Sequence, residues 1–142
     1  MLIQPYLFFE GRCEEALEFY KTALGAQVQM MMRYSENPEP QNSPDCPPMP
    51  GDKIMHASFS VGDNVLMASD GMASGKTEFK GISLSLSVPT EAESEKIFAS
   101  LAEGGQVQMP LTKTFYSPSF GMVADKFGVS WMVMVPGDMP PQ

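Results

Sequence analysis

The residues best suited to chemistry alternate along a predicted β-strand at 54–61. His56, Ser58 and Ser60 share one side of this strand, because successive side chains of a strand point to opposite faces. His56 is the only histidine of the chain, and imidazole is the side chain that ordinarily titrates near neutral pH. Two interpretations stay open for His56: a general base or ligand contact, and a hydrogen-bonded structural residue.

A second predicted strand, at 81–88, repeats this arrangement. Ser83, Ser85 and Ser87 alternate with four branched apolar residues. Serine is a poor strand former, and its small hydroxyl leaves room in front of a sheet. We therefore expect the two serine faces to line a cavity, although a face of an antiparallel sheet can also simply meet water.

Other residues have a chemical and a structural interpretation side by side. Asp70 could orient a cationic ligand or occupy a turn position that aspartate favours. Cys13 begins a predicted helix, where a thiolate would be stabilised, but a lone cysteine is usually inert. Lys76, after Ser74 and Gly75, resembles a phosphate-binding turn but lacks the glycine spacing of a P-loop. The candidates for an aromatic pocket wall, half of which we expect in the core, are Tyr6, Phe8, Phe115, Tyr116, Phe120 and Trp131.

Hydrophobic periodicity places these residues on a pattern of strand, helix and three strands that occurs twice. We predict an α+β fold: two tandem βαβββ modules that form one curved mixed sheet with the helices on the outer face. The chain is predicted to be a single domain, 1–142, with modules at about 1–70 and 80–135. The predicted helices follow Gly11 and Thr90, and the predicted strands lie at 3–9, 27–34, 54–61, 65–69, 81–88, 106–111, 120–125 and 131–135.

A proline-rich loop at 35–53 separates the strands of the first module. It holds six prolines and almost nothing apolar. A loop of this length in a small domain is typical of a lid, a binding loop or a mobile segment. If the fold serves only as an interaction module, this loop could be its docking arm.

Composition excludes several classes of protein. The chain has 142 residues, 43% of them apolar, and 9 basic against 17 acidic side chains give a net charge of −8. An acidic chain without a basic run is a poor binder of nucleic acid or anionic membranes, and no apolar run is long enough to span a bilayer. The N-terminus has no basic region typical of a signal peptide. Two cysteines fit a reduced, cytoplasmic protein, and 13 methionines suit loose packing or adaptable pockets.

Three segments carry a resemblance to a known family. PYLFFEGRCEEALEFYKTALGA at 5–26, HASFSVGDNVLMASDGMASGK at 56–76 and TFYSPSFGMVADKFGVSWMV at 114–133 resemble the PhnB-like branch of the vicinal oxygen chelate superfamily. That superfamily includes glyoxalase I, extradiol dioxygenases and bleomycin-resistance proteins. The resemblance implies its paired-module fold, a homodimer, and a structural role for the turn at 125–128.

Metal enzymes of this superfamily take ligands from four strand positions. Aligned by the motifs, these fall at Pro5, flanked by Gln4 and Tyr6, at Met67 or Ser69, at Ser83 and at Met132. Divalent metals need nitrogen and oxygen donors that converge, and these residues offer none of the usual set. The resemblance therefore predicts no cofactor by the usual pattern and leaves open a divalent metal in another arrangement.

Two functions remain. The first is a glyoxalase-like protein that binds a small molecule and would sequester it as bleomycin-resistance proteins do. The alternative is a lyase or isomerase on a small organic substrate, with His56 as base or as part of an unusual metal site. The predicted ligand-binding residues are Tyr6, Phe8, His56, Ser58, Ser69, Ser83, Ser85 and Met132.

Overall fold

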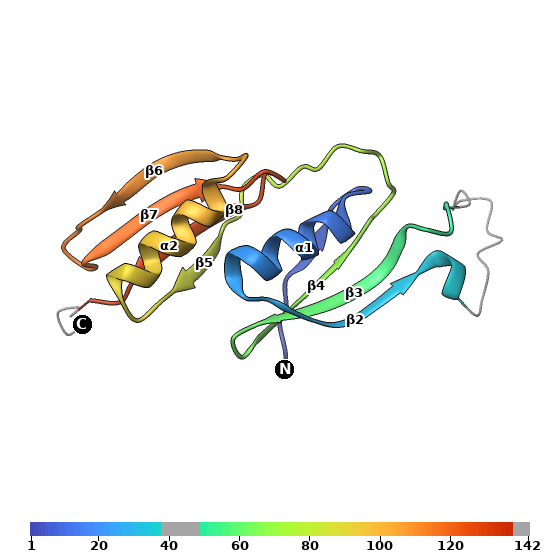
Figure 1. Ribbon diagram of the computed structural model, residues 1–142, viewed down its shortest axis with the longest axis horizontal. Coiled ribbons are helices and arrows are strands. Elements are labelled where there is room, and N and C mark those ends of the chain that lie inside the picture. Colours follow the sequence, from blue (N-terminus) through green and yellow to red (C-terminus); the bar gives the residue numbers. More distant parts are fainter. Residues whose placement is uncertain (38–48, 138–142) are drawn as a thin grey trace. The chain divides into compact units, whose positions relative to one another are not determined.

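The computed structural model describes residues 1–37 and 49–137 of the chain. The residues form two compact units, a first at Met1–Thr77 and a second that begins at Glu78. The elements, shown in Figure 1, are β1 (Tyr6–Phe8), α1 (Cys13–Leu24), β2 (Gln27–Arg33), the short 3-10 helix Tyr34–Glu36, β3 (Ile54–Val61), β4 (Asn64–Ser69), β5 (Leu84–Ser87), α2 (Glu91–Ala102), β6 (Gln106–Thr112), β7 (Ser119–Ala124) and β8 (Ser130–Val135).

Each unit contains one four-stranded mixed sheet with the same topology. The strand order is β1-β4-β3-β2 in the first unit and β5-β8-β7-β6 in the second. In each sheet the first strand runs parallel to its neighbour, and the remaining pairs are antiparallel. The predicted α+β fold of two βαβββ modules is confirmed, while the strands hydrogen bond as two sheets of four rather than as one.

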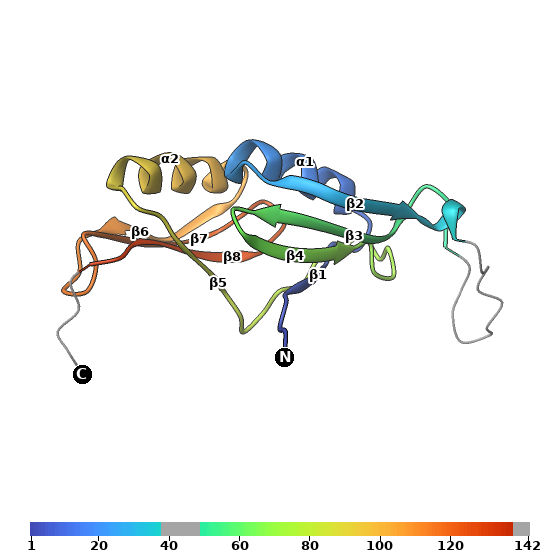
Figure 2. The ribbon, with the colours of Figure 1, turned by 90° about the horizontal axis from the view of Figure 1, so that it is seen from below.

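A helix packs on one face of each sheet, as Figure 2 shows for α1 and α2. In the first unit the buried side chains of α1 include Leu17 and Tyr20. The Tyr20 ring stacks on Phe59 of β3, with ring centroids 5.9 Å apart. Because Phe59 alternates with Ser58 and Ser60, the serines fall on the sheet face that the helix leaves uncovered. We call this side of each sheet its open face.

The helix ends follow the sequence signals. The hydroxyl of Thr90 accepts a hydrogen bond from the Glu93 backbone N–H (3.1 Å), so the predicted N-cap is confirmed. Gly25 ends α1 in the left-handed conformation (φ 66°), which costs a residue without Cβ little.

Two predicted strands are shorter by several residues in the structure, and β2 ends one residue earlier than predicted. The first strand spans only Tyr6–Phe8, and β5 starts at Leu84. Pro5 explains the first difference, because a proline nitrogen cannot donate to a ladder. Its carbonyl still accepts a hydrogen bond from the Met67 N–H (3.0 Å). Upstream, Leu2 is 78% exposed.

One edge strand of each sheet, β2 in the first unit and β6 in the second, contains a β-bulge within the same four-residue sequence, Gln-Val-Gln-Met. The pairing steps from Val28 to Met30 in β2 and from Val107 to Met109 in β6 while the partner strand advances by one residue. The extra residues are therefore Gln29 and Gln108. A further shift near Arg33 buries Ile54 and leaves Met55 half-buried, so the strict alternation predicted for β3 fails at its start.

The proline-rich loop predicted at 35–53 is described only at its ends, since 38–48 lie outside the described residues. There, the backbone N–H groups of Tyr34 and Ser35 donate to the carbonyls of Lys53 and Gly51 (both 3.0 Å). Among the residues that the structure describes, no helix has the length and apolar character to cross a membrane.

Candidate functional site

The open face of the first sheet gathers several of the predicted site residues. The strand register places Tyr6, Met67, Ser58 and Met30 side by side across four strands. His56 lies one row away, directly opposite Met32. The serine face predicted for 54–61 is thus the face opposite α1, as its alternation indicated, and Tyr6 belongs to the same face.

Tyr6 and His56 form the central contact of this face. The Tyr6 hydroxyl and His56 Nδ1 are 2.9 Å apart, and the ring centroids are 5.5 Å apart. Both side chains are half-buried. The two residues come from β1 and β3, which are separated by β4, so the hydrogen bond crosses the sheet. The strand pattern and the aromatic residues of the sequence predict both residues for the site, but not the hydrogen bond between them.

Phe8 and Ser69, at the ends of β1 and β4, differ in exposure and in hydrogen bonding. The Phe8 ring is 53% exposed, and its centroid lies 5.0 Å from that of Tyr6. Ser69 is only 4% exposed, and its hydroxyl accepts a hydrogen bond from the Gly71 N–H (3.1 Å). Phe8 is therefore available to a ligand, whereas the Ser69 hydroxyl is already engaged in the turn.

The second sheet carries the other predicted ligand contacts. Ser85 is exposed and lies opposite Met132, which is half-buried. Matching the two strand registers puts Ser85 in the place of Tyr6 and Phe120 in the place of His56. The tyrosine–histidine pair is thus a feature of the first unit.

The aromatic residues of the second unit divide between core and surface. Trp131 is 3% exposed, and its indole N–H donates to Asp125 Oδ2 (2.9 Å). It faces α2 together with Val133, so Trp131 is one of the aromatic candidates that lie in the core, as expected for half of them. Phe120 is buried beside Tyr116 with centroids 5.6 Å apart, whereas Phe115 is 87% exposed.

Asp70 has a structural role. Its carboxylate is 2% exposed and accepts hydrogen bonds from the backbone N–H groups of Cys13 (2.8 Å) and Ile54 (2.5 Å). It thereby ties the start of α1 to the start of β3. Of the two interpretations of Asp70, the contacts support a structural role rather than a ligand contact. Its partners lie farther away in the sequence than the partners of a turn residue would.

The Cys13 thiol is not poised for reaction. The side chain is fully buried. Burial, and then the negative charges of Asp70 and Glu14, raise the pKa of the Cys13 thiol from 9.0 to about 12. The inert interpretation of Cys13 is supported. Cys46 lies outside the described residues.

Two turns also have local explanations. Ser74 Oγ accepts a hydrogen bond from the Lys76 N–H (3.3 Å), and the Gly75 N–H donates to the Glu10 carbonyl (2.7 Å). These contacts hold the loop in place without forming a phosphate cradle. At 125–128, Asp125 Oδ1 accepts hydrogen bonds from the Phe127 and Val129 N–H groups (2.9 and 3.1 Å), which supports the structural role implied by the resemblance.

The residues at the superfamily's metal positions do not fit a divalent metal. Among the aligned positions, Tyr6 pairs with Met67 in the strand register, the Ser83 hydroxyl donates a hydrogen bond to Ser130 (2.9 Å), and Met132 supplies only a thioether. Phenol, hydroxyl and thioether groups are weak ligands for zinc, manganese or iron(II). Over residues 1–37 and 49–137, no group of three or more His, Cys, Asp and Glu side chains could hold a metal.

A pocket in the second unit involves residues that sequence analysis missed. Its volume is about 540 Å³, and its polar lining includes Lys80, Gln108 and Ser130 together with the predicted Ser83. The available signal was the repeat of Gln-Val-Gln-Met at 27–30 and 106–109. This repeat marks equivalent bulges, and bulges often redirect a side chain near a functional site.

Comparison with known proteins identifies the family. Residues 2–134 match the family model described as 3-demethylubiquinone-9 3-methyltransferase. Protein YjdN of Escherichia coli is 35% identical over the full length of both chains. Protein PA1353 of Pseudomonas aeruginosa is 46% identical, with 97% and 99% of the two chains covered and a TM-score of 0.81. A putative 3-demethylubiquinone-9 3-methyltransferase, PhnB protein, of Bacillus cereus is 31% identical, with 95% and 99% covered and a TM-score of 0.77.

A more distant likeness concerns the fold alone. A glyoxylase/bleomycin resistance protein/dioxygenase domain from Frankia is 15% identical, covers 95% of this chain and 94% of its own, and has a TM-score of 0.60. The two strand-to-helix connections, at 9–12 and 88–90, together contain a single glycine. They therefore do not fit the glycine-rich strand-to-helix turn with which a methyltransferase would bind its cofactor. The match over nearly the whole chain places the protein in the 3-demethylubiquinone-9 3-methyltransferase family, to which the similar PhnB protein of Bacillus cereus is also assigned by its description.

Proposed function

We propose that this protein binds a small organic molecule on the open face of its first sheet. The observation that carries this proposal is the half-buried hydrogen bond between Tyr6 and His56 beside the exposed ring of Phe8. A polar pair next to an aromatic ring suits a flat ligand that stacks on the ring and exchanges one hydrogen bond.

The surroundings of the pair indicate the kind of ligand. Met30 and Met67 lie on either side of Ser58, and Met32 lies opposite His56 in the next row. Unbranched, polarisable methionine side chains adapt to ligands of different shape. Since the chain carries a net charge of −8, its long-range field favours neutral or cationic molecules.

The direction of the Tyr6–His56 hydrogen bond decides what the imidazole can do. If the phenol donates to Nδ1, the proton of neutral His56 is on Nε2, which then donates to a ligand carbonyl. If Nδ1–H donates to the phenol oxygen, Nε2 is a free base. Binding uses the first tautomer, and proton abstraction uses the second.

The second tautomer supports the alternative function, a lyase or isomerase with His56 as general base. The hydrogen bond to Tyr6 would orient the ring for this role, as an orienting partner does for a catalytic histidine. A ¹⁵N spectrum of the His56 imidazole distinguishes the tautomers. Nε2–H supports binding, and Nδ1–H with a free Nε2 favours the base.

The test of binding uses benzamide, which offers a ring and a carbonyl, and benzamidine, its cationic counterpart. We expect saturable amide shift changes around Tyr6 and His56 in ¹H–¹⁵N spectra. Tyr6→Phe should weaken binding about 5-fold through the loss of one hydrogen-bonding partner. Tyr116→Phe, in the second unit, is the matched control and should change nothing. Shift changes confined to other residues, or equal affinities in Tyr6→Phe and the parent, would reject the site.

The family resemblance also leads us to propose a cytoplasmic homodimer. A dimer in which paired modules complete each other's sites is the arrangement implied for this superfamily. Light scattering coupled to size-exclusion chromatography should give twice the mass of the 142-residue chain. A monomeric mass at micromolar concentration would overturn the dimer without affecting the ligand site on the first sheet.

A further inference from the structure

The second unit contains a pocket that the proposed function does not use. It has a volume of about 540 Å³ and lies where the segment before β5 meets β6, β7 and β8. All its lining residues come from the second unit. Those that matter for its chemistry are Lys80, Ile82, Ser83, Gln108, Met122 and Ser130.

A directed chain of hydrogen bonds forms the polar wall of this pocket. Ser83 Oγ donates to Ser130 Oγ (2.9 Å), which donates to Gln108 Oε1 (3.1 Å). Each hydroxyl has a single hydrogen, so these donations fix the orientation of the Gln108 amide. In the part of the chain that the structure describes, the amide nitrogen of Gln108 has no hydrogen-bond partner. Its two N–H groups are therefore left to donate.

The β-bulge in β6 is what brings Gln108 to this wall. Gln108 and Met109 together oppose Met122, because Gln108 is the extra residue of the bulge. A bulge redirects a side chain that regular pleating would otherwise place elsewhere. The strand register thus positions the Gln108 amide beside Ser130, which lies in β8, and Ser83, which lies in the segment before β5.

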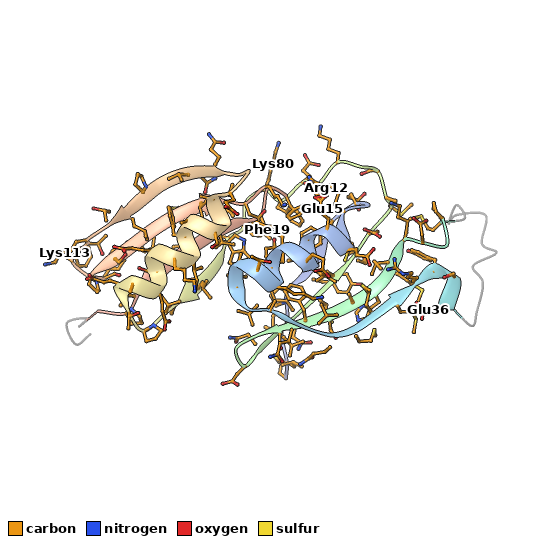
Figure 3. The ribbon with its side chains drawn as sticks, in the orientation of Figure 1. Arg12, Glu15, Phe19, Glu36, Lys80 and Lys113 are labelled. Carbon is orange, nitrogen blue, oxygen red and sulfur yellow. The ribbon has the colours of Figure 1, made fainter. Side chains whose placement is uncertain are left out.

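Charge and apolar surface complete the pocket. Lys80 extends from the segment before β5 (Figure 3) with its side chain 87% exposed, and its Nζ is 3.8 Å from Glu78 Oε1. Ile82 is 59% exposed, and Met122 is half-buried. An ammonium and an amide donor next to apolar side chains suit a ligand with a carboxylate on an apolar body.

The corresponding place in the first unit lacks the lysine and the two serines, although Gln29 is the equivalent of Gln108. A pocket of about 350 Å³ there is lined by Leu2, Ile3 and Val65 and by the polar residues Gln4, Asp63 and Asn64. By strand register, Val65 takes the place of Ser130. Ser83, Ser130 and Lys80 therefore occur in only one of the two units. The fold that the two units share does not require them.

We propose that this pocket binds small organic carboxylates, with Lys80 and the Gln108 amide on the carboxylate and with Ile82 and Met122 against the apolar body. The proposal does not depend on the ligand site of the first sheet. The pocket takes an anion through local donors, although the chain as a whole is acidic.

The experiment titrates the full chain with sodium benzoate and follows backbone amides by ¹H–¹⁵N NMR. Benzamide, which has the same ring without the charge, is the matched probe. We expect saturable shift changes at Ser83, Gln108 and Ser130 with benzoate and at least about 10-fold weaker binding of benzamide there. Lys80→Met should weaken benzoate binding about 10-fold or more, whereas Lys96→Met, on α2, should leave it unchanged.

Ser130→Ala provides the second test, because it removes the hydroxyl that orients Gln108 while the lysine remains. We expect benzoate binding to weaken about 5-fold, with the amide spectrum otherwise preserved. Equal affinity for benzoate in the parent, Lys80→Met and Ser130→Ala would overturn the proposal, as would the absence of saturable changes in the pocket. Changes around Tyr6 and His56 report on the first sheet alone, so failure of one site is distinguishable from failure of the other.

Discussion

Asp70 joins two elements through a single buried carboxylate. It accepts hydrogen bonds from backbone N–H groups at the starts of α1 and β3. Asp70→Asn keeps the shape but removes the charge and turns one acceptor into a donor. Because hydrogen bonds to a charged group are stronger than neutral ones, we expect the free energy of unfolding to fall by about 2 kcal/mol. Urea denaturation measures this, and Asp63→Asn, in the exposed β3–β4 turn, should change it by less than about 0.5 kcal/mol.

The buried Cys13 thiol should be protected in the folded protein. With a pKa of about 12 against an ordinary 9.0, its thiolate fraction at pH 8 is about 1,000-fold lower. In a Cys46→Ser background, iodoacetamide should label Cys13 only after unfolding in guanidinium. Rapid labelling under native conditions would contradict its burial.

The same shift predicts a loss of stability in alkali. The folded-state pKa of Cys13 is raised above its unfolded value, so the neutral thiol contributes its full stabilisation below about pH 9. That contribution is lost as the pH rises towards about 12. The free energy of unfolding, measured by denaturant at several pH values over this window, should fall less steeply in Cys13→Ala than in the parent.

At the scale of elements, α2 packs against β7 over a glycine. A Cβ on Gly121 would lie 2.8 Å from Phe98 Cε2 and 3.0 Å from Leu111 Cδ2. We expect Gly121→Ala to lower the free energy of unfolding by about 1–3 kcal/mol through overpacking. In a Phe98→Leu background the added cost should be smaller, because a branched aliphatic side chain leaves more room. Equal costs in both backgrounds would show that Phe98 is not the obstacle.

Periodicity predicted most of these elements and the face of β3 that carries His56. The first helix begins at Cys13 as predicted, and the strand at Ile54–Val61 has the predicted bounds. The Tyr6–His56 contact was beyond prediction because it depends on β4 lying between β1 and β3, a long-range pairing that local sequence does not specify. Which of the six aromatic candidates lie in the core could not be predicted either, because this depends on the packing of the helices against the sheets. Trp131, which alternates with Val133 and Val135, proves to be buried.

At the scale of the whole molecule, we predict that the chain works without the divalent metal that the resemblance implies for the metal enzymes of the vicinal oxygen chelate superfamily. Asp70 is committed to backbone N–H groups, which leaves His56 without a carboxylate partner from that residue. Elemental mass spectrometry of untagged protein should find far less than one metal per chain. Zinc, manganese, nickel and cobalt should leave the melting temperature unchanged. Near-stoichiometric metal that disappears in His56→Gln would contradict this prediction.

The bulge shared by β2 and β6 has a consequence for how such a protein can change over evolution. A bulge fixes which residues of an edge strand face each way, so losing one residue from only one copy would invert the faces downstream of it. Point substitutions carry no such penalty. The two copies of such a framework therefore diverge by substitution at equivalent positions. Val65 in the first copy and Ser130 in the second are one such pair. Each copy can then acquire its own binding preference through single-residue steps, as the Tyr6–His56 pair in the first unit and the Ser83–Ser130–Gln108 chain in the second illustrate.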